Sequence, residues 1–253
     1  MDIKIIKCLD DNYSYLLIDK INSTCCVVDP GEPEVVKEII EKKKLKLNFI
    51  LNTHHHFDHV GGNIVLKKEF GAKVLGYSDD KNRIPGIDIF LNDGDVWEEG
   101  NFKAKIFHIP GHTSGHICFN FFEEKLLFTG DTLFSLGCGR VFEGTYSQML
   151  NSLNLIKKFP PETKVYFGHE YTQNNLNFCK KYDANNSFLK EKEISIKSKL
   201  KINEPTTPVS LEEELKTNIF LRCNDKLLKS NLGLNNASEE QIFKKLRDLK
   251  DSF

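Results

Sequence analysis

Residues 53–59 (THHHFDH) place four side chains that can bind a metal ion within six residues. They follow residues 47–51 (LNFIL), an apolar run that predicts a β-strand. A loop that leaves a rigid strand can direct several ligands to one point, and imidazole together with carboxylate suits zinc, iron(II) or manganese. A solvated His-rich turn is the alternative, but tag-like tracts lack the interposed aspartate. The spacing predicts a metal site at His54, His56, Asp58 and His59.

Three later turns repeat one arrangement, in which an apolar run is followed by a glycine and then by a possible ligand. The ligands are His112 after Gly111, Asp131 after Gly130, and His169 after Gly168. A glycine lets the backbone bend sharply and brings the next side chain close to a metal. Any one of these residues alone would be read as a turn or capping residue. Together with the first cluster they form a set of seven ligands.

Three histidines are not expected to bind metal. In an extended segment the side chain of His55 points away from those of His54 and His56. His108 ends a strand-like run and is expected to be packed or half-exposed. We interpret His116 as a structural histidine; the alternative is a residue that supports a ligand without binding the metal itself.

The order of the seven ligands resembles that of the metallo-β-lactamase superfamily. Three strings narrow the resemblance to glyoxalase II, the hydroxyacylglutathione hydrolases: residues 53–63 (THHHFDHVGGN), 137–140 (GCGR) and 168–172 (GHEYT). The resemblance extends from the first strand to the final residues. It implies an α/β (α+β) fold, an αββα metallo-β-lactamase-like sandwich followed by a small all-helical C-terminal domain.

The resemblance also implies two divalent metal ions per chain. Zinc is the expected metal, and iron and manganese are the alternatives. By position, His54, His56 and His112 would bind the first ion, and Asp58, His59 and His169 the second. Asp131 would bridge the two ions. Two metals about 3.5–4 Å apart can lower the pKa of a shared water to about 7, which yields a bridging hydroxide as the nucleophile. Asp58 and Asp131 are therefore the expected catalytic residues.

The implied reaction is hydrolysis of the thioester of an S-(2-hydroxyacyl)glutathione, such as S-D-lactoylglutathione, to glutathione and D-lactate. This is the second step of methylglyoxal detoxification. A thiol with a pKa of about 8.5 leaves as a thiolate without strong help from a general acid, whereas an amine must be protonated to leave. The site therefore suits thioesters better than amides.

Glutathione has two carboxylates, so its site needs cations. The resemblance places the substrate contacts at Arg140, Phe142, Tyr171, Arg247 and Lys250. Arg247 and Lys250 are three residues apart and share one helix face; the alternative is a solvated helix end that favours cations. The chain departs from the family, which often has Lys at position 140, Tyr at position 142 and Pro at position 219. The Phe142 departure removes a hydroxyl, and with it a possible hydrogen bond to substrate.

Residues 1–174 are expected to form the catalytic domain, and residues 175–253 a helical substrate-binding domain. Strands are predicted at residues 3–6, 13–18, 24–28, 47–51, 73–75, 102–109, 117–122, 126–129 and 164–167, with a hairpin at 123–125. Helices are predicted at residues 33–43, from near 62, and at 147–158. After residue 175 strand signals vanish and helices are predicted at 174–182, 187–200, 210–216 and 239–249. Ser210 and Glu213 match a capping box.

Composition excludes several classes of partner. The formal net charge of -1 gives no strong field for nucleic acid or membrane, and the Lys/Glu run at residues 190–201 is expected to be a solvated helix face. No apolar stretch approaches the roughly 20 residues of a transmembrane helix. The 7 cysteines include no C-x-x-C pair and are expected to be reduced and mostly buried. A monomer in the cytoplasm is the expected state.

Two alternative functions differ in class from a thioesterase. One is a persulfide dioxygenase of the same superfamily, which uses a single iron and has a shorter tail. The other is an inactive, metal-stabilised interaction module. The GHEYT string and the long C-terminal region disfavour the first, and the presence of all seven ligands disfavours the second. β-Lactamase or lactonase activity is compatible with the site as a side reaction.

Overall fold

The computed structural model describes residues 1–253 and divides into two compact units. Unit 1 contains Met1–His108 and Gly115–Gly130, and unit 2 contains Ile109–Ser114 and Asp131–Phe253. The chain therefore enters unit 2 briefly before it finally leaves unit 1. This division follows compactness alone, and the domain boundary at residue 174 stays a prediction.

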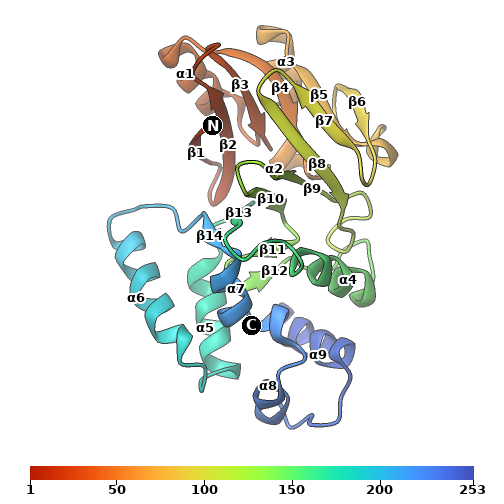
Figure 1. Ribbon diagram of the computed structural model, residues 1–253, viewed down its shortest axis with the longest axis vertical. Helices are drawn as coiled ribbons and strands as arrows, with labels where there is room; N and C mark the ends of the chain where they lie inside the picture. The colour runs from red at the N-terminus through yellow and green to blue at the C-terminus, as the bar shows by residue number, and fades with distance from the viewer. The chain divides into compact units, whose positions relative to one another are not determined.

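The first sheet of unit 1 is mixed. Its order is β1 (Asp2–Cys8), β2 (Asn12–Asp19), β3 (Thr24–Val28), β4 (Lys46–Leu51), β5 (Lys73–Tyr77) and β6 (Ile87–Leu91). Strands β1 to β3 pair in antiparallel fashion, whereas β3 to β6 are parallel. Parallel neighbours need a crossover connection, and α1 (Pro33–Lys43) supplies it from β3 to β4 and α3 (Asn63–Phe70) from β4 to β5. Both helices lie along this sheet in Figure 1 and share one apolar core with it.

The second sheet of unit 1 is antiparallel. Strands β7 (Val96–Glu99), β8 (Phe102–His108), β9 (Ile117–Phe121) and β10 (Leu126–Gly130) pair in chain order. The β9–β10 hairpin confirms the turn predicted at residues 123–125. Aromatic side chains join the two sheets: the ring centroids of Phe49 and Trp97 are 5.1 Å apart, and those of Tyr15 and Phe128 are 5.4 Å apart. Unit 1 is thus a helix layer on two packed sheets.

Unit 2 is mainly helical. Its short strands are β11 (Leu133–Phe134), paired with β12 (Gly137–Cys138), and β13 (Lys164–Phe167), paired with β14 (Val209–Ser210). Its helices are α4 (Tyr146–Ile156), α5 (Thr172–Tyr182), α6 (Phe188–Lys201), α7 (Leu211–Thr217), α8 (Lys226–Asn231) and α9 (Glu239–Asp251), with a 3-10 helix at Ile219–Arg222. Helices α5 and α6 run side by side (Figure 1), and Lys180 of α5 donates to Glu193 of α6 at 2.8 Å.

Most predicted elements are present, and the misses are short. Strands β6, β7, β11 and β12, helix α8 and the short helix at Phe57–Val60 were not predicted. The prediction that strands end near residue 175 is wrong at β14, in which two residues pair with β13. The Ser210 hydroxyl caps α7 by accepting from the Glu213 N–H, but the Glu213 carboxylate lies 3.3 Å from Lys192 Nζ. Complete capping boxes instead begin α4 and α9.

The prediction of a solvated face on α6 is wrong at Lys192. This side chain is 5% exposed, and its ammonium lies 3.4 Å from the fully buried Glu214 carboxylate and 3.3 Å from that of Glu213. A buried charge needs such partners. The alternating positive and negative residues of α6 therefore include one lysine, Lys192, whose ammonium forms a buried ion pair.

All seven cysteines are free and buried, as predicted. No helix in the chain combines the length and the apolar character that crossing a membrane would require.

Candidate metal centre

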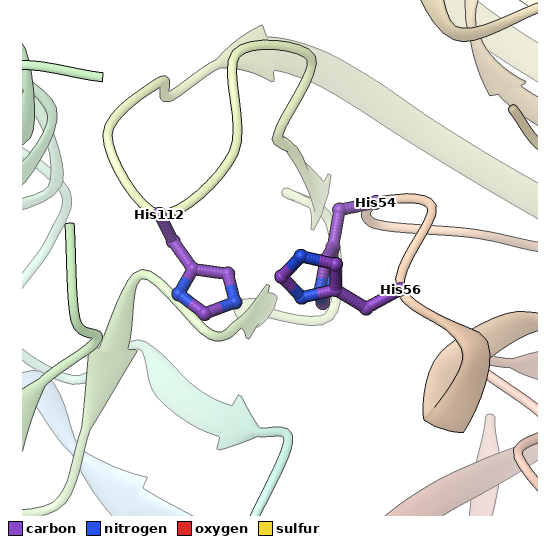
Figure 2. A group of neighbouring side chains, drawn as sticks. All are labelled: His54, His56 and His112. Carbon is purple, nitrogen blue, oxygen red and sulfur yellow. The ribbon is translucent and has the colours of Figure 1, made fainter. Parts of the chain in front are cut away.

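The first set of predicted ligands lies where β4 ends. His54 and His56 lie on the loop that leaves β4 (Figure 2), and Asp58 and His59 lie on the short helix α2 (Phe57–Val60) that follows at once. The ring centroid of His54 is 4.7 Å from that of His56 and 4.2 Å from that of His59. His54 and His59 are buried, whereas His56 and Asp58 are half-buried. The structure brings these four side chains together.

A residue that the sequence reasoning missed, Asp29, orients this set. Because β3 and β4 are parallel, Asp29 after β3 and Thr53 after β4 leave the sheet at the same edge. The Asp29 carboxylate accepts from the Thr53 N–H at 2.8 Å and from its hydroxyl at 2.7 Å, and lies 3.1 Å from His59 Nδ1. One ligand atom each from Asp29, His54 and His59 lie within 4.8 Å of one another. Asp29 follows a strand just as His54 does, and that was the available signal.

These contacts determine which ring nitrogens face outward. A carboxylate only accepts, so His59 Nδ1 donates to Asp29. The Thr53 hydroxyl already donates to Asp29, so it accepts from His54 Nδ1, 3.1 Å away. In both imidazoles Nε2 is then the nitrogen that can bind a metal ion, and such support of the other ring nitrogen is common in metal sites.

Asp58 is positioned by Asn12, at the start of β2. The Asn12 amide donates to the Asp58 carboxylate at 2.8 Å and to its backbone carbonyl at 3.2 Å. The same carboxylate oxygen, Oδ2, lies 3.5 Å from His59 Nε2. No motif in the sequence pointed to Asn12, because its partner is 46 residues away.

The second set of predicted ligands belongs to unit 2. His112 lies on the loop that follows β8 (Figure 2), Asp131 follows β10, and His169 follows β13. Oδ2 of Asp131 lies 3.4 Å from His112 Nε2 and 3.2 Å from His169 Nε2. Nδ1 of His112 donates to the Arg140 carbonyl at 2.9 Å, so Nε2 again faces the aspartate. All three ligands are buried.

The glycine before Asp131 meets the predicted need. Gly130 has φ of 48°, and a Cβ there would lie 2.4 Å from Thr53 Oγ1 and 2.8 Å from the His116 ring. A larger residue would therefore disturb the backbone that presents Asp131.

The three excluded histidines have different neighbours. His55 Nδ1 lies 3.3 Å from a carboxylate oxygen of Asp80, which is fully buried. The ring of His116 stacks on that of His54 with centroids 4.6 Å apart, and the ring of His108 stacks on Tyr77.

Five imidazoles and two carboxylates make a donor set that divalent metal ions of the zinc, iron and manganese type accept. Nδ1 of His54, His59 and His112 each contacts another group of the protein. An aspartate oxygen lies close to Nε2 of His59 in unit 1, and to Nε2 of His112 and His169 in unit 2. The clusters therefore fit divalent metal ions.

The predicted substrate contacts all belong to unit 2, and four of them are at least partly accessible. Phe142 is exposed, and its ring centroid lies 5.3 Å from that of His112. Tyr171 is partly exposed and stacks on His169, with centroids 4.8 Å apart. The Arg140 side chain is 54% exposed, with Nε 3.3 Å from Asp251. Lys250 is half-buried and donates to Asn174; desolvation and the charge of Arg247 lower its pKa to about 8.

Arg247 differs from the other four. Its side chain is 5% exposed, which overturns the alternative of a solvated helix end. Nη1 donates to the Cys138 carbonyl at 2.7 Å, and Nε donates to Asp251 at 2.9 Å. Its guanidinium also lies 5.2 Å from the centroid of the Phe220 ring.

Comparison with known proteins gives consistent matches over the whole chain. The model of the metallo-beta-lactamase superfamily matches residues 9–169, and that of the hydroxyacylglutathione hydrolase C-terminus matches residues 170–253. A hydroxyacylglutathione hydrolase from Pelagibacter ubique (strain HTCC1062) is 56% identical over 253 residues, which are 100% of both chains. One from Chelativorans sp. (strain BNC1) is 41% identical over 253 residues, covering 100% of this chain and 99% of the relative.

A solved structure shares the fold at much lower identity. ETHE1 from Myxococcus xanthus matches with a TM-score of 0.70 at 23% identity, covering 98% of this chain and 91% of that chain. This likeness concerns the fold alone. With the family matches, it confirms the predicted metallo-β-lactamase-like fold and its helical C-terminal region.

Proposed function

This chain belongs to the hydroxyacylglutathione hydrolases of the metallo-β-lactamase superfamily, and we propose that its His and Asp ligands bind two divalent metal ions for thioester hydrolysis. The reaction is hydrolysis of an S-(2-hydroxyacyl)glutathione to glutathione and a 2-hydroxy acid. The observation that carries the proposal is the complete ligand set, with Asp131 Oδ2 within 3.4 Å of Nε2 of both His112 and His169.

The ligands divide between the two ions as the family order suggests. His54, His56 and His112 bind one ion, and Asp58, His59 and His169 bind the other. Asp131 would be a ligand of both ions, since its Oδ2 already lies near Nε2 of His112 and of His169. Zinc is the proposed metal, with iron or manganese as the alternatives. Bound there, such ions lower the pKa of a water toward about 7 and polarise a carbonyl.

The protein's own groups orient the reactants. Asp58, steadied by the Asn12 amide, accepts a hydrogen bond from the attacking water and so directs its lone pair toward the thioester carbon. When the C–S bond breaks, the sulfur leaves as a thiolate. A thiol of pKa about 8.5 needs no strong acid beside it, so a thioester can be cleaved here without a dedicated general acid.

The substrate's tripeptide is proposed to lie along residues of unit 2. Arg140 and Lys250 offer cations to the two glutathione carboxylates, and Tyr171 and Phe142 offer exposed rings near His169 and His112. Arg247, the fifth predicted contact, has a buried guanidinium that binds the Cys138 carbonyl and Asp251 instead. Residues 1–174 would then act as the catalytic domain, and residues 175–253 as the domain that binds the tripeptide.

S-D-Lactoylglutathione is the proposed substrate, which would place the chain at the second step of methylglyoxal detoxification. We propose a cytoplasmic location, because seven buried free thiols suit a reducing compartment. The proposed oligomeric state is a monomer. A net charge of -1 favours neither nucleic acid nor a membrane surface as a partner.

The deciding experiment is steady-state hydrolysis of S-D-lactoylglutathione by protein whose metal content has been measured. We expect two metal equivalents per chain and turnover that a chelator abolishes. One iron per chain, with oxygen consumed on adding glutathione persulfide, would instead indicate a dioxygenase. Full metal content without any turnover would indicate an interaction module.

A further inference from the structure

The β11–β12 hairpin is bound by side chains rather than by further strands. Its carbonyl groups accept from Asn218, which lies between α7 and the 3-10 helix, and from Asn175 of α5. Asn218 donates to the carbonyls of Phe134 and Gly137 at 3.1 and 3.0 Å, and Asn175 donates to that of Ser135 at 3.0 Å. A two-residue strand pair has little stability of its own. The helical side chains therefore determine where this hairpin lies within unit 2.

Arg247 continues this series at the end of the hairpin. Nη1 donates to the Cys138 carbonyl at 2.7 Å and lies 3.4 Å from that of Gly139. Nε and Nη2 lie 2.9 and 2.8 Å from Oδ1 of Asp251. All three guanidinium nitrogens thus have partners within the chain, which hold the side chain in place between helix α9 and the hairpin.

The other side of this backbone faces two metal ligands. A Cβ on Gly139 would lie 1.9 Å from the Asp131 carbonyl oxygen and 3.2 Å from His112 Nδ1. The next carbonyl, that of Arg140, accepts the hydrogen bond from His112 Nδ1 at 2.9 Å. Residues 138–140 therefore lie between the Arg247 guanidinium and the His112 imidazole, within one unit.

We propose that Arg247 is a positioning residue for the metal ligand His112, acting through the backbone of Cys138, Gly139 and Arg140. The inference rests on the proposed function, since it takes His112 as a ligand. Nη1 reaches both carbonyls while Nε and Nη2 bind Asp251, and a lysine ammonium does not reproduce this fixed planar arrangement of donors. The Arg140 carbonyl then sets the tautomer and the orientation of the His112 ring. Losing such an outer contact typically weakens metal binding by about 10–100-fold.

The test compares Arg247→Lys and Arg247→Gln with the wild type and with Lys245→Ala, an exposed residue of the same helix. Zinc affinity is measured by competition with a chromogenic chelator. KM and kcat are measured for S-D-lactoylglutathione and for a small thioester that lacks the tripeptide. Circular dichroism selects the variants that fold.

We expect both Arg247 variants to bind zinc about 10–100-fold more weakly, and to lose kcat at limiting zinc on both thioesters, with partial recovery in excess zinc. Lys245→Ala should match the wild type. Unchanged zinc affinity, with a higher KM for the glutathione thioester alone, would overturn the proposal and make Arg247 a substrate contact. If neither variant folds, loss of zinc affinity in Asp251→Asn, which releases the other side of the guanidinium, supports the proposal; unchanged affinity overturns it.

Failure of the underlying assignment gives a different result. If His112→Ala keeps the full zinc content and affinity of the wild type, His112 is not a ligand and the proposed function is wrong in that assignment. If His112→Ala loses zinc while the Arg247 variants keep wild-type affinity, only the positioning role of Arg247 is wrong.

Discussion

The carboxylate of Asp29 lies 3.1 Å from Nδ1 of His59, although 30 residues separate them in the chain. The contact exists because β3 and β4 are parallel and end at one edge of the sheet. Asp29 also binds Thr53, whose hydroxyl accepts from His54. One buried carboxylate therefore orients two imidazoles of the same loop.

Replacing Asp29 with Asn should weaken metal binding while preserving the fold. Asparagine tolerates the positive φ of 49° at this position, but its amide lacks the charge and offers only one acceptor oxygen. We expect about 10–100-fold lower zinc affinity, measured by chelator competition. Asp19→Asn, at the end of β2 and away from every histidine contact described here, is the matched control. Equal affinity in the two variants would show that Asp29 does not orient the ligands.

Asp131→Asn should nearly abolish turnover. Its Oδ2 lies near Nε2 of both His112 and His169, and an amide oxygen is a much weaker bridge between two cations than a carboxylate. We expect a fall in metal content along with kcat, measured on the same preparation. A near-normal kcat with two metal equivalents still bound would remove Asp131 from the site.

His55→Ala should cost stability rather than metal. The His55 ring lies against the fully buried Asp80 carboxylate, which would keep only its ion pair with Arg83. A buried acceptor that loses a partner costs about 1–3 kcal/mol, so the urea midpoint should fall. Metal content should stay at the wild-type value, whereas His54→Ala should lose metal. The reverse pattern would mean that His55 and not His54 is the ligand.

The KM for the glutathione thioester should rise as the pH passes the pKa of Lys250, about 8, because the Lys250 ammonium then loses its charge. Kinetics from about pH 7 to about pH 9 should show this rise in the wild type, but not in Lys250→Arg, whose guanidinium stays charged. A small thioester without the tripeptide is the control substrate. The same KM profile in both proteins would exclude Lys250 as a carboxylate contact.

The same pKa gives a stability test with a definite sign. Desolvation holds the pKa of Lys250 in the folded chain below its ordinary value of 10.5. Between these two values the unfolded chain binds more protons, so the Lys250 contribution to stability rises with pH. Below pH of about 8, Lys250→Met should be more stable than the wild type, and the gap should narrow at higher pH. Urea unfolding at two pH values measures it, and a gap that widens would contradict the shift.

The proposed ligands could be identified in the sequence because they lie in the segments that follow strands β4, β8, β10 and β13 and are of distinctive residue types. The residues that orient them could not all be predicted in this way. Asn12 and the Arg140 carbonyl act through contacts that depend on strand pairing and on a bound hairpin, and neither leaves a local pattern. The burial of Lys192 and Arg247 could not be predicted from the local sequence either. Charged residues on an amphipathic helix read as solvated, and only tertiary partners reveal that they are buried.

The burial of the seven cysteines has a consequence for an enzyme that releases a thiol at every turnover. Exchange with a disulfide needs a thiolate, and burial raises the pKa of Cys25 and Cys179 to about 12 and that of Cys138 to about 11. The chain should therefore resist S-glutathionylation when glutathione disulfide accumulates around it. Intact mass after incubation with glutathione disulfide should show no added tripeptide, and a rapid mass increase in folded protein would contradict this. Such an enzyme can release glutathione into surroundings rich in glutathione disulfide without its own cysteines being modified.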